Sequence, residues 1–178
     1  MDIVSFDNLE VPPDLKACAD ALLREANGQD GDADDVEVDT DGNPPEAYRA
    51  FLAVDASGKV VGHLAAYIRG VDQGSASMTV GMIGNVATRK TFRRRGIAKS
   101  LVDASHRYFR DAGARFSILF AYDLPVYVSY GYRLMRDQVT FVERAAAVKT
   151  CVLPGSMLCE LTTRPQRAGT VNLTGPPV

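Results

Sequence analysis

The chain has 178 residues, of which 46% are hydrophobic and 24% are charged, a balance typical of one soluble globular domain spanning residues 1–178 rather than of a disordered chain. Its formal net charge of -2 gives no overall basic excess of the kind that favours nucleic acid or anionic membranes. No stretch approaches the roughly 20 apolar residues of a membrane span, and the first residues lack the basic and apolar regions of a signal peptide, so we expect a cytoplasmic protein.

The first part of the chain predicts a strand, a helix and an acidic loop. Residues 3–6 favour a short strand, and a proline pair followed by apolar residues at helical spacing predicts a helix that Gly28 ends. From about 29 to 45 the residues are acidic and turn-forming, so we expect a long loop. Its alternating aspartates resemble a calcium loop, but the glycine and the bidentate glutamate of such a loop are missing, so we expect no metal site.

A β-hairpin and a further strand follow. Between residues 48 and 71, two β-rich runs joined by a turn sequence predict an antiparallel hairpin. Residues 77–88 predict the next strand. Gly81, Gly84 and Asn85 are unusual inside a strand, and they indicate a bulge or a place where a ligand approaches the backbone.

The strongest helix signal lies in the middle of the chain. Apolar residues recur at helical spacing from 96 to 112, and Gly113 follows as a stop. Residues 116–122 then form a short apolar run that predicts a central strand. A strand, a helix and a strand in this order form a βαβ unit, so we expect the strand at 77–88 to lie parallel to this one.

The last part of the chain predicts shorter elements. Asp123 is a plausible cap for a short helix that ends near Tyr130. The chain then resumes as a strand over 132–142, and a last apolar run covers 150–161. The tail from 163 to 178 is rich in proline and glycine, so we expect it to be irregular.

A cationic turn joins the strand at 77–88 to the long helix. The first amides of a helix have no internal partner and carry the positive end of the helix dipole, so they can bind a phosphate. Gly96 lets the backbone approach a ligand closely. Guanidinium and ammonium groups add positive charge beside these amides, and they come from Arg93, Arg94, Arg95 and Lys99.

Two motifs resemble those of the GCN5-related N-acetyltransferase (GNAT) superfamily. The sequence Arg93-x-x-Gly96-x-Ala98 resembles the Gln/Arg-x-x-Gly-x-Gly/Ala signature with which this family holds the pyrophosphate of coenzyme A. Further along, Tyr127-Val-Ser-Tyr-Gly131-Tyr132 resembles the family's Tyr-x-x-x-Gly-Phe/Tyr segment. Both motifs occur in the family's order, which makes chance matches unlikely to explain the pair.

The resemblance implies an α/β GNAT fold, with a mixed, mostly antiparallel central sheet that contains a splayed parallel strand pair and is flanked by helices. It also implies that acetyl-CoA is the acyl donor. The backbone of Val86, Ala87 and Thr88 would contact the pantetheine and the thioester. The residues expected around the diphosphate are Arg93, Arg94, Arg95, Gly96, Ile97, Ala98 and Lys99.

The reaction implied is direct attack of a neutral primary amine on the thioester, through a tetrahedral intermediate, with release of coenzyme A. Tyr127 stands where the family often has its general acid, and the alternative is that it only packs against the cofactor. Many relatives place a glutamate on the strand corresponding to 77–88, and this strand has no carboxylate. His63 is a candidate base, although a lone histidine in an apolar strand is more often structural.

The acceptor stays open at this point. The turn region resembles that of enhanced-intracellular-survival-type aminoglycoside acetyltransferases, and we expect the primary amine of a small molecule as acceptor. A coenzyme A-binding sensor with the same fold but no activity is the first alternative. A nucleic-acid patch is the second, and the lack of interleaved aromatic residues opposes it. Paired subunits are common in the superfamily, so a homodimer is possible.

Overall fold

The computed structural model describes residues 1–28, 48–142, 148–162 and 169–173. These residues form two compact units, which are described separately. The first contains Met1–Ala65 and Asn85–Ala104, and the second contains Ala66–Gly84 and Ser105–Val178. Among the described residues, no helix is both long and apolar enough to cross a membrane. The acidic segment near 29–45, on which the loop and calcium interpretations rest, lies outside the described residues.

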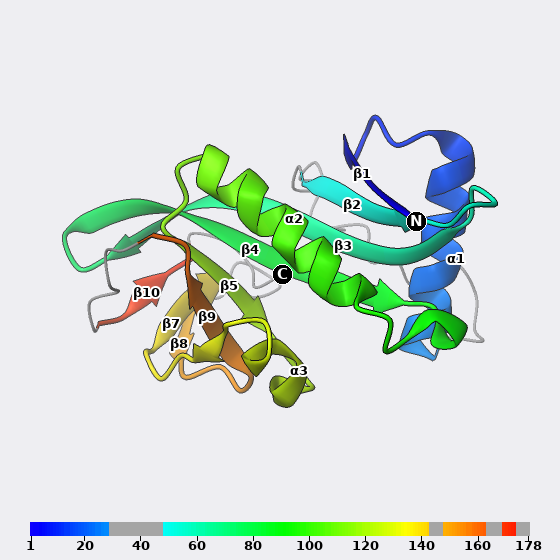
Figure 1. Cartoon of the computed structure of the whole chain (residues 1–178). Coiled ribbons are helices and arrows are strands. Elements are labelled where there is room, and N and C mark those ends of the chain that lie inside the picture. The colour runs from blue at the N-terminus through cyan, green and yellow to red at the C-terminus, as the bar shows by residue number, and fades with distance from the viewer. Residues whose placement is uncertain (29–47, 143–147, 163–168, 174–178) are drawn as a thin grey trace. The chain divides into compact units, whose positions relative to one another are not determined.

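The first unit begins with a β-ribbon and a helix (Figure 1). Strand β1 (Asp2–Asp7) pairs antiparallel with β2 (Arg49–Val54), and β2 also pairs with β3 (Val60–Gln73). Helix α1 (Pro13–Asn27) ends at Gly28, as the sequence predicts. The apolar face of α1 packs on these strands because residues at helical spacing share one side of the helix. The buried core here consists of Ala19, Leu22, Leu52, Val60 and Ala87.

The first unit also holds the turn that leads into the long helix. Strand β4 (Ala76–Thr88) ends here, a short 3-10 turn η2 (Lys90–Phe92) follows, and α2 (Ile97–Asp111) begins. A Cβ atom at Gly62 of β3 would lie 2.6 Å from the side chain of Ile97. The absence of a side chain at this position therefore lets the first turn of α2 pack directly on the strand.

The second unit is built on a mixed sheet. Its remaining elements are β5 (Phe116–Phe120), α3 (Leu124–Val128), β6 (Arg133–Leu134), β7 (Val139–Val142), β8 (Val148–Cys151), β9 (Ser156–Glu160) and β10 (Val171–Asn172). The strand order is β6-β9-β5-β4-β3-β10-β7-β8. β4 lies parallel to β5, and β10 lies parallel to β7; the pairs β5–β9, β6–β9, β7–β8 and β3–β10 are antiparallel. The parallel pairing of β4 with β5 confirms the βαβ prediction.

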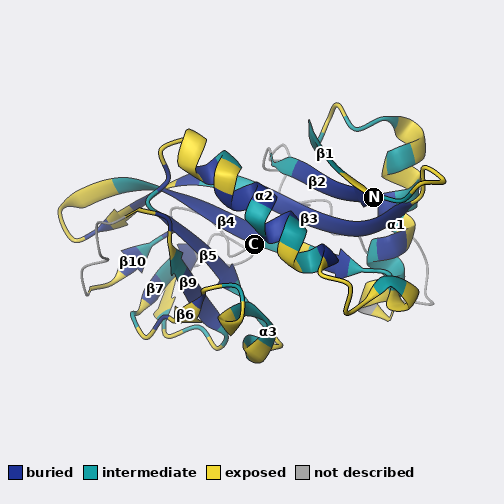
Figure 2. Ribbon diagram, viewed as in Figure 1, coloured by how far each residue is buried: buried dark blue, intermediate teal, exposed yellow. Residues whose placement is uncertain are grey.

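The register of the parallel pair runs from Gly81 opposite Ser117 to Ile83 opposite Leu119. Gly81 proves to be a packing position rather than part of a bulge, because a Cβ atom there would overlap the ring of Phe109 on α2. Phe109 is fully buried, and Figure 2 shows that α2 turns one buried edge inward and an exposed face outward. Asn85 is the residue of β4 with a left-handed φ, of 51°, and the bulge there stays a prediction.

Two predictions for the later chain are wrong. The run 132–142 is not one strand, because β6 pairs with β9 and β7 pairs with β8, and residues 135–138 between them belong to neither strand. The tail is not irregular throughout, since β10 pairs with both β3 and β7. Position 123 does precede α3, but the Asp123 side chain makes no capping hydrogen bond.

Candidate functional site

The turn between β4 and α2 combines unusual backbone conformations. Asn85, Arg94 and Gly96 have φ values of 51°, 60° and 78°, and only Gly96 adopts this left-handed conformation without a steric cost. Arg93, which precedes Arg94, is extended, with a φ of -63° and a ψ of 159°. Backbone strain of this kind tends to cluster at functional sites.

The start of α2 leaves amide groups available beside this turn. The first turn of the helix closes where the Ser100 amide donates to the Gly96 carbonyl oxygen at 2.9 Å. The amides of Ile97, Ala98 and Lys99 therefore have no carbonyl one turn back inside the helix. A Cβ atom placed on Gly96 would meet no atom within 4 Å among the described residues, its chain neighbours aside, so the space beside Gly96 is open. Ile97 itself is 2% exposed and anchors the helix start in the core.

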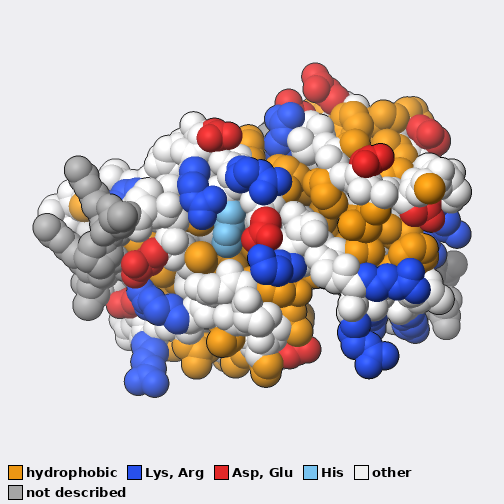
Figure 3. Space-filling model, viewed as in Figure 1, with side chains coloured by type: hydrophobic (Ala, Val, Ile, Leu, Met, Phe, Trp, Pro, Cys, Tyr) orange, Lys and Arg blue, Asp and Glu red, His pale blue; other side chains and the backbone are white. Residues whose placement is uncertain are grey.

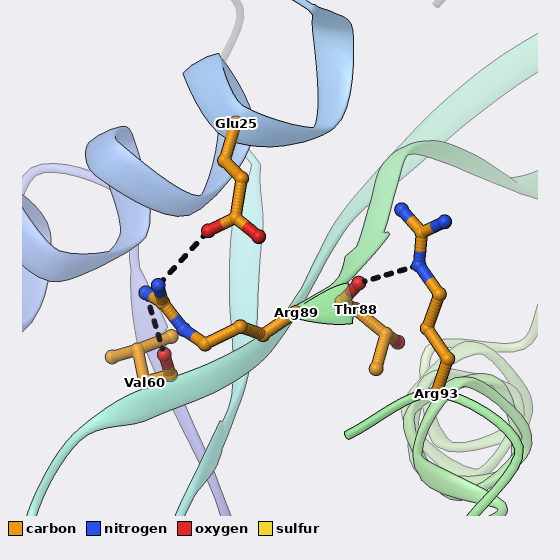
Figure 4. A network of polar contacts seen from close by, with 5 residues as sticks. All are labelled: Glu25, Val60, Thr88, Arg89 and Arg93. Atoms are coloured by element: carbon orange, nitrogen blue, oxygen red, sulfur yellow. Dashed lines mark hydrogen bonds and ion pairs between the residues drawn. The ribbon is translucent and has the colours of Figure 1, made fainter. Parts of the chain in front are cut away.

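The cationic side chains of the turn make different contacts. Arg93 donates from Nε to the Thr88 carbonyl oxygen at 3.1 Å, which leaves its two terminal nitrogens pointing away from the strand (Figure 4). The Arg95 guanidinium lies 5.2 Å from the centre of the Phe92 ring. Lys99 pairs with Asp103 one turn along the helix, at 2.7 Å, rather than with any group of the turn. Arg93, Arg94 and Arg95 are all exposed.

These side chains form a basic surface on the first unit. Figure 3 shows blue side chains gathered at the end of this unit that carries the turn. Because the chain as a whole is slightly acidic, this surface is a local feature. Exposed guanidinium groups beside unpaired helix amides suit the two linked phosphates of a nucleotide cofactor.

Arg89, which sequence reasoning missed, fixes the strand end that leads into the turn. Its Nη1 lies 2.9 Å from Oε2 of Glu25 on α1, and its Nη2 lies 3.5 Å from the Val60 carbonyl oxygen (Figure 4). Its own amide donates to the Val61 carbonyl oxygen at 2.9 Å. In the sequence Arg89 is only one more cation of the basic run, and its contacts cannot be predicted from that.

The backbone expected to contact the pantetheine lies at the end of β4. Ala87 is 5% exposed and belongs to the core of the first unit, which fixes this backbone, while Val86 and Thr88 are half-buried. The Thr88 hydroxyl oxygen is buried and has no hydrogen-bond partner among the described residues. An unpaired buried hydroxyl costs free energy, so this atom is a candidate to bond a ligand.

His63 lies in β3 of the first unit, 3% exposed, with Nδ1 2.8 Å from the Asn85 carbonyl oxygen. Burial lowers the pKa of His63, while the hydrogen bond to Asn85 and the charge of Asp20 act in the opposite direction. A carbonyl oxygen only accepts hydrogen bonds, so Nδ1 of the neutral ring carries the proton. The lone pair of His63 is therefore on Nε2.

Tyr127 lies in α3 of the second unit and is half-buried. Its ring meets those of Tyr130 and Tyr132 edge-on, with centroid distances of 5.9 and 6.1 Å. Burial raises the pKa of Tyr127 to about 12, and Tyr130 and Asp123 act in the same direction. The phenol consequently stays protonated at every physiological pH, which allows it to donate a hydrogen bond.

The predicted site residues fall into two groups. His63, Val86–Thr88 and Arg93–Lys99 lie in the first unit, and Tyr127 lies in the second. Within the first unit, the structure joins His63 to Asn85 and Arg93 to Thr88. Among the described residues, no group of three or more histidine, cysteine or acidic side chains could hold a metal ion.

Comparison with known proteins identifies the family of this chain. The family model described as the acetyltransferase (GNAT) domain matches residues 20–135, which is more than half of the chain. No curated protein matches the sequence.

Solved structures resemble the fold at low sequence identity. The GNAT family N-acetyltransferase YhbS from Escherichia coli, in complex with CoA, has a TM-score of 0.64 and 17% identity over 97% of this chain and 89% of its own. An aminoglycoside 6'-N-acetyltransferase complexed with coenzyme A has a TM-score of 0.61 and 20% identity, covering 93% of this chain and all of its own. Eis1 from Mycobacterium abscessus has a TM-score of 0.58 and 19% identity, over 74% of this chain and 32% of its own.

Proposed function

Because the chain belongs to the GNAT acetyltransferase family, we propose that it is an enzyme that transfers an acetyl group from acetyl-CoA to a primary amine of a small molecule. The observation that carries the proposal is the turn before α2, in which Arg94 and Gly96 are left-handed and a Cβ atom on Gly96 would point into open space. We place the enzyme in the cytoplasm, because its three cysteines are free thiols, as expected in a reducing compartment.

In this proposal the diphosphate of acetyl-CoA lies on the amides of Gly96, Ile97, Ala98 and Lys99. The terminal nitrogens of Arg93 and the guanidinium groups of Arg94 and Arg95 contact the phosphate oxygens. Lys99 would have to leave Asp103 to join them, so its pairing makes it the weakest contributor. The fit rests on the open space at Gly96 and on the unpaired Thr88 hydroxyl.

The reaction forms one bond and breaks one. The amine nitrogen attacks the thioester carbonyl carbon, a C–N bond replaces the C–S bond, the nitrogen loses a proton and the sulfur leaves as coenzyme A thiolate. A backbone amide at Ala87 or Thr88 would stabilise the negative charge that develops on the carbonyl oxygen, an effect worth roughly 3 kcal/mol for one such donor.

We assign Tyr127 to the leaving sulfur. Full proton transfer from a phenol with a pKa of about 12 to a thiolate with a pKa near ~8.5 is uphill by about 5 kcal/mol. Tyr127 therefore acts first as a hydrogen-bond donor to the sulfur. It completes the transfer as general acid only where bound substrate lowers its pKa.

We assign His63 as the candidate base. Its lowered pKa keeps it neutral at pH 7, and its proton on Nδ1 leaves Nε2 as the basic atom. The hydrogen bond from Nδ1 to Asn85 would steady the imidazole during such a step, as a backbone acceptor often does for a catalytic histidine. Amines that reach the site already neutral need no base before attack, and at high pH solvent can take the proton that the nitrogen loses afterwards, so activity without His63 at high pH is compatible with this assignment.

The proposed class of acceptor rests on the solved structures with similar folds. One of the similar folds is an aminoglycoside 6'-N-acetyltransferase, which supports a small molecule with a primary amine as the acceptor. The homodimer common in the superfamily stays a prediction, and so does the single domain of residues 1–178.

Turnover separates an enzyme from a coenzyme A sensor. Thiol release from acetyl-CoA is measured with a panel of primary amines, including an aminoglycoside, a polyamine and a dipeptide, and acetylated product is confirmed by mass spectrometry. The proposal predicts amine-dependent thiol release that falls at least tenfold in Tyr127→Phe, while acetyl-CoA binding by calorimetry is retained. Tight acetyl-CoA binding without turnover on any amine would favour the sensor, and no binding at millimolar concentration would refute both.

A further inference from the structure

Three buried polar side chains meet in the second unit. The hydroxyl oxygen of Tyr132 lies 2.5 Å from Oγ of Ser117 on β5 and 2.8 Å from Nε2 of His106 on α2. Ser117, Tyr132 and His106 are 0%, 2% and 6% exposed, so water does not complete this network. The ring of His106 also lies 5.5 Å from the ring of Tyr132, between centroids.

Such a network is costly to keep for stability alone. Each group gives up hydrogen bonds to water, and apolar side chains of the same shape would fill a core about as well or better. What a fully bonded network does supply is a fixed geometry, because the hydroxyl can satisfy both partners in only one position. Burial raises the pKa of Tyr132 well above its usual value, so the phenol keeps its proton.

Tyr132 contacts Tyr127 in two ways, so a fixed Tyr132 also restrains Tyr127. Its backbone amide donates to the Tyr127 carbonyl oxygen at 3.1 Å, and its ring meets the Tyr127 ring edge-on at 81°. The helix that carries Tyr127 has five residues, none of them buried, and no side-chain cap from Asp123. A helix this short is not stable by itself, so an anchor outside it must set its position.

We propose that His106 and Ser117 are positioning residues that, by fixing the Tyr132 hydroxyl, hold the ring of Tyr127 in the orientation in which it works. The network joins α2 and β5 to the residue Tyr132, which follows α3 in the chain. The proposal rests on the function assigned above to Tyr127. His106 and Ser117 are buried, so in this proposal their effect on the reaction passes through Tyr132 to Tyr127.

The variants distinguish the effect of the hydrogen bonds to the Tyr132 hydroxyl from the effect of side-chain size. Tyr132→Phe keeps the ring and removes the hydroxyl, and His106→Leu removes the bond to Tyr132. His106→Gln is the conservative partner, because its amide can reach the place of Nε2 and bond the same hydroxyl. Arg107→Gln, an exposed change one residue along α2, is the matched control.

The first measurement needs no activity. Carbon–proton spectra of protein labelled in tyrosine are recorded at neutral pH, with Tyr127→Phe used to identify the Tyr127 signal. The signal should move toward its position in an unfolded peptide in His106→Leu and in Tyr132→Phe, and should stay in place in His106→Gln and Arg107→Gln. An unmoved Tyr127 signal in folded His106→Leu and Tyr132→Phe would overturn the proposal, whether or not the protein proves to be an enzyme.

The second measurement uses turnover. His106→Leu and Tyr132→Phe should lower kcat about tenfold and change the KM for acetyl-CoA less than about twofold, because the loss acts only on Tyr127. In a Tyr127→Phe background, Tyr132→Phe should cause no further loss of kcat. An equal loss in both backgrounds would show that Tyr132 acts independently of Tyr127 and would refute the proposal. Absence of turnover in the unaltered protein would refute the proposed function instead, and the spectra would still decide the positioning role.

Discussion

The Nδ1 atom of His63 lies 2.8 Å from the carbonyl oxygen of Asn85, the left-handed residue that interrupts β4. A buried imidazole from the neighbouring strand therefore bonds the backbone at the one position where that strand leaves regular geometry. The contact gives His63 a structural role that is independent of catalysis, and it makes the fold sensitive to the protonation of this ring.

The stability of the protein should fall on mild acidification because of His63. Burial lowers the pKa of His63 in the folded chain below its usual value of 6.5. Above pH 6.5 the ring is neutral in both states, and as the pH falls below 6.5 the unfolded chain takes up the proton first. The free energy of unfolding, from urea titrations between pH 7.5 and 5, should decrease, and His63→Gln should flatten this dependence. An equally steep decrease in the variant would show that other groups cause it.

Gly81→Ala should destabilise the protein by about 1–3 kcal/mol, the usual cost of overpacking a core. The added methyl group would overlap the Phe109 ring, which is fully buried and cannot move outward. Thermal unfolding measures the loss. Combining the change with Phe109→Leu should recover part of it, because the smaller side chain makes room. If the two losses simply add, the two side chains do not compete for the same space.

Arg94→Gly should raise stability and lower affinity for acetyl-CoA. A non-glycine residue with a φ of 60° carries a steric cost of roughly 1–2 kcal/mol, which glycine avoids. The lost guanidinium should weaken acetyl-CoA binding about tenfold, as expected for one charge-assisted hydrogen bond. Calorimetry measures the affinity and thermal unfolding the stability. Arg107→Gln, which removes an exposed cation from α2, away from the turn that holds Arg94, should leave affinity unchanged.

The ion pair between Arg89 and Glu25 should contribute measurably to stability. The two side chains are 19% and 32% exposed, and Nε of Arg89 is buried without a partner among the described residues. Glu25→Gln should therefore cost about 1 kcal/mol, and a double-mutant cycle with Arg89→Met should show a favourable coupling of similar size. Lys16→Met serves as comparison, since its exposed pair with Asp20 should cost less than about 0.5 kcal/mol.

The sequence predicts the helices and strands whose formation depends on residues near one another in the chain. The periodicity of α2, the stop at Gly28 and the βαβ order are all readable along the chain, and they gave the fold family together with the two motifs. The structure adds one feature of the cationic turn that the composition could not reveal. Arg94 and Gly96 share the left-handed conformation, although only glycine is expected there.

The features that were missed depend on contacts between distant residues. Nothing near Gly81 in the sequence indicates that Phe109 lies over it, so the glycine was interpreted as a bulge. The network of His106, Ser117 and Tyr132 joins residues up to 26 positions apart and has no local signature. Arg89 illustrates the same limit, because its partner Glu25 is 64 residues away.

The two residues of β10 bind the end of the described chain into the sheet. Val171 of β10 and Leu173, which follows the strand, are 3% and 0% exposed, and β10 lies between β3 and β7. A protein shortened before residue 169 would present two open strand edges and a gap in its apolar core, and open edges recruit the strands of other molecules. Truncation there should therefore produce insoluble aggregates rather than a trimmed enzyme, so a short segment of low regularity sets the limit on how far this chain can be cut.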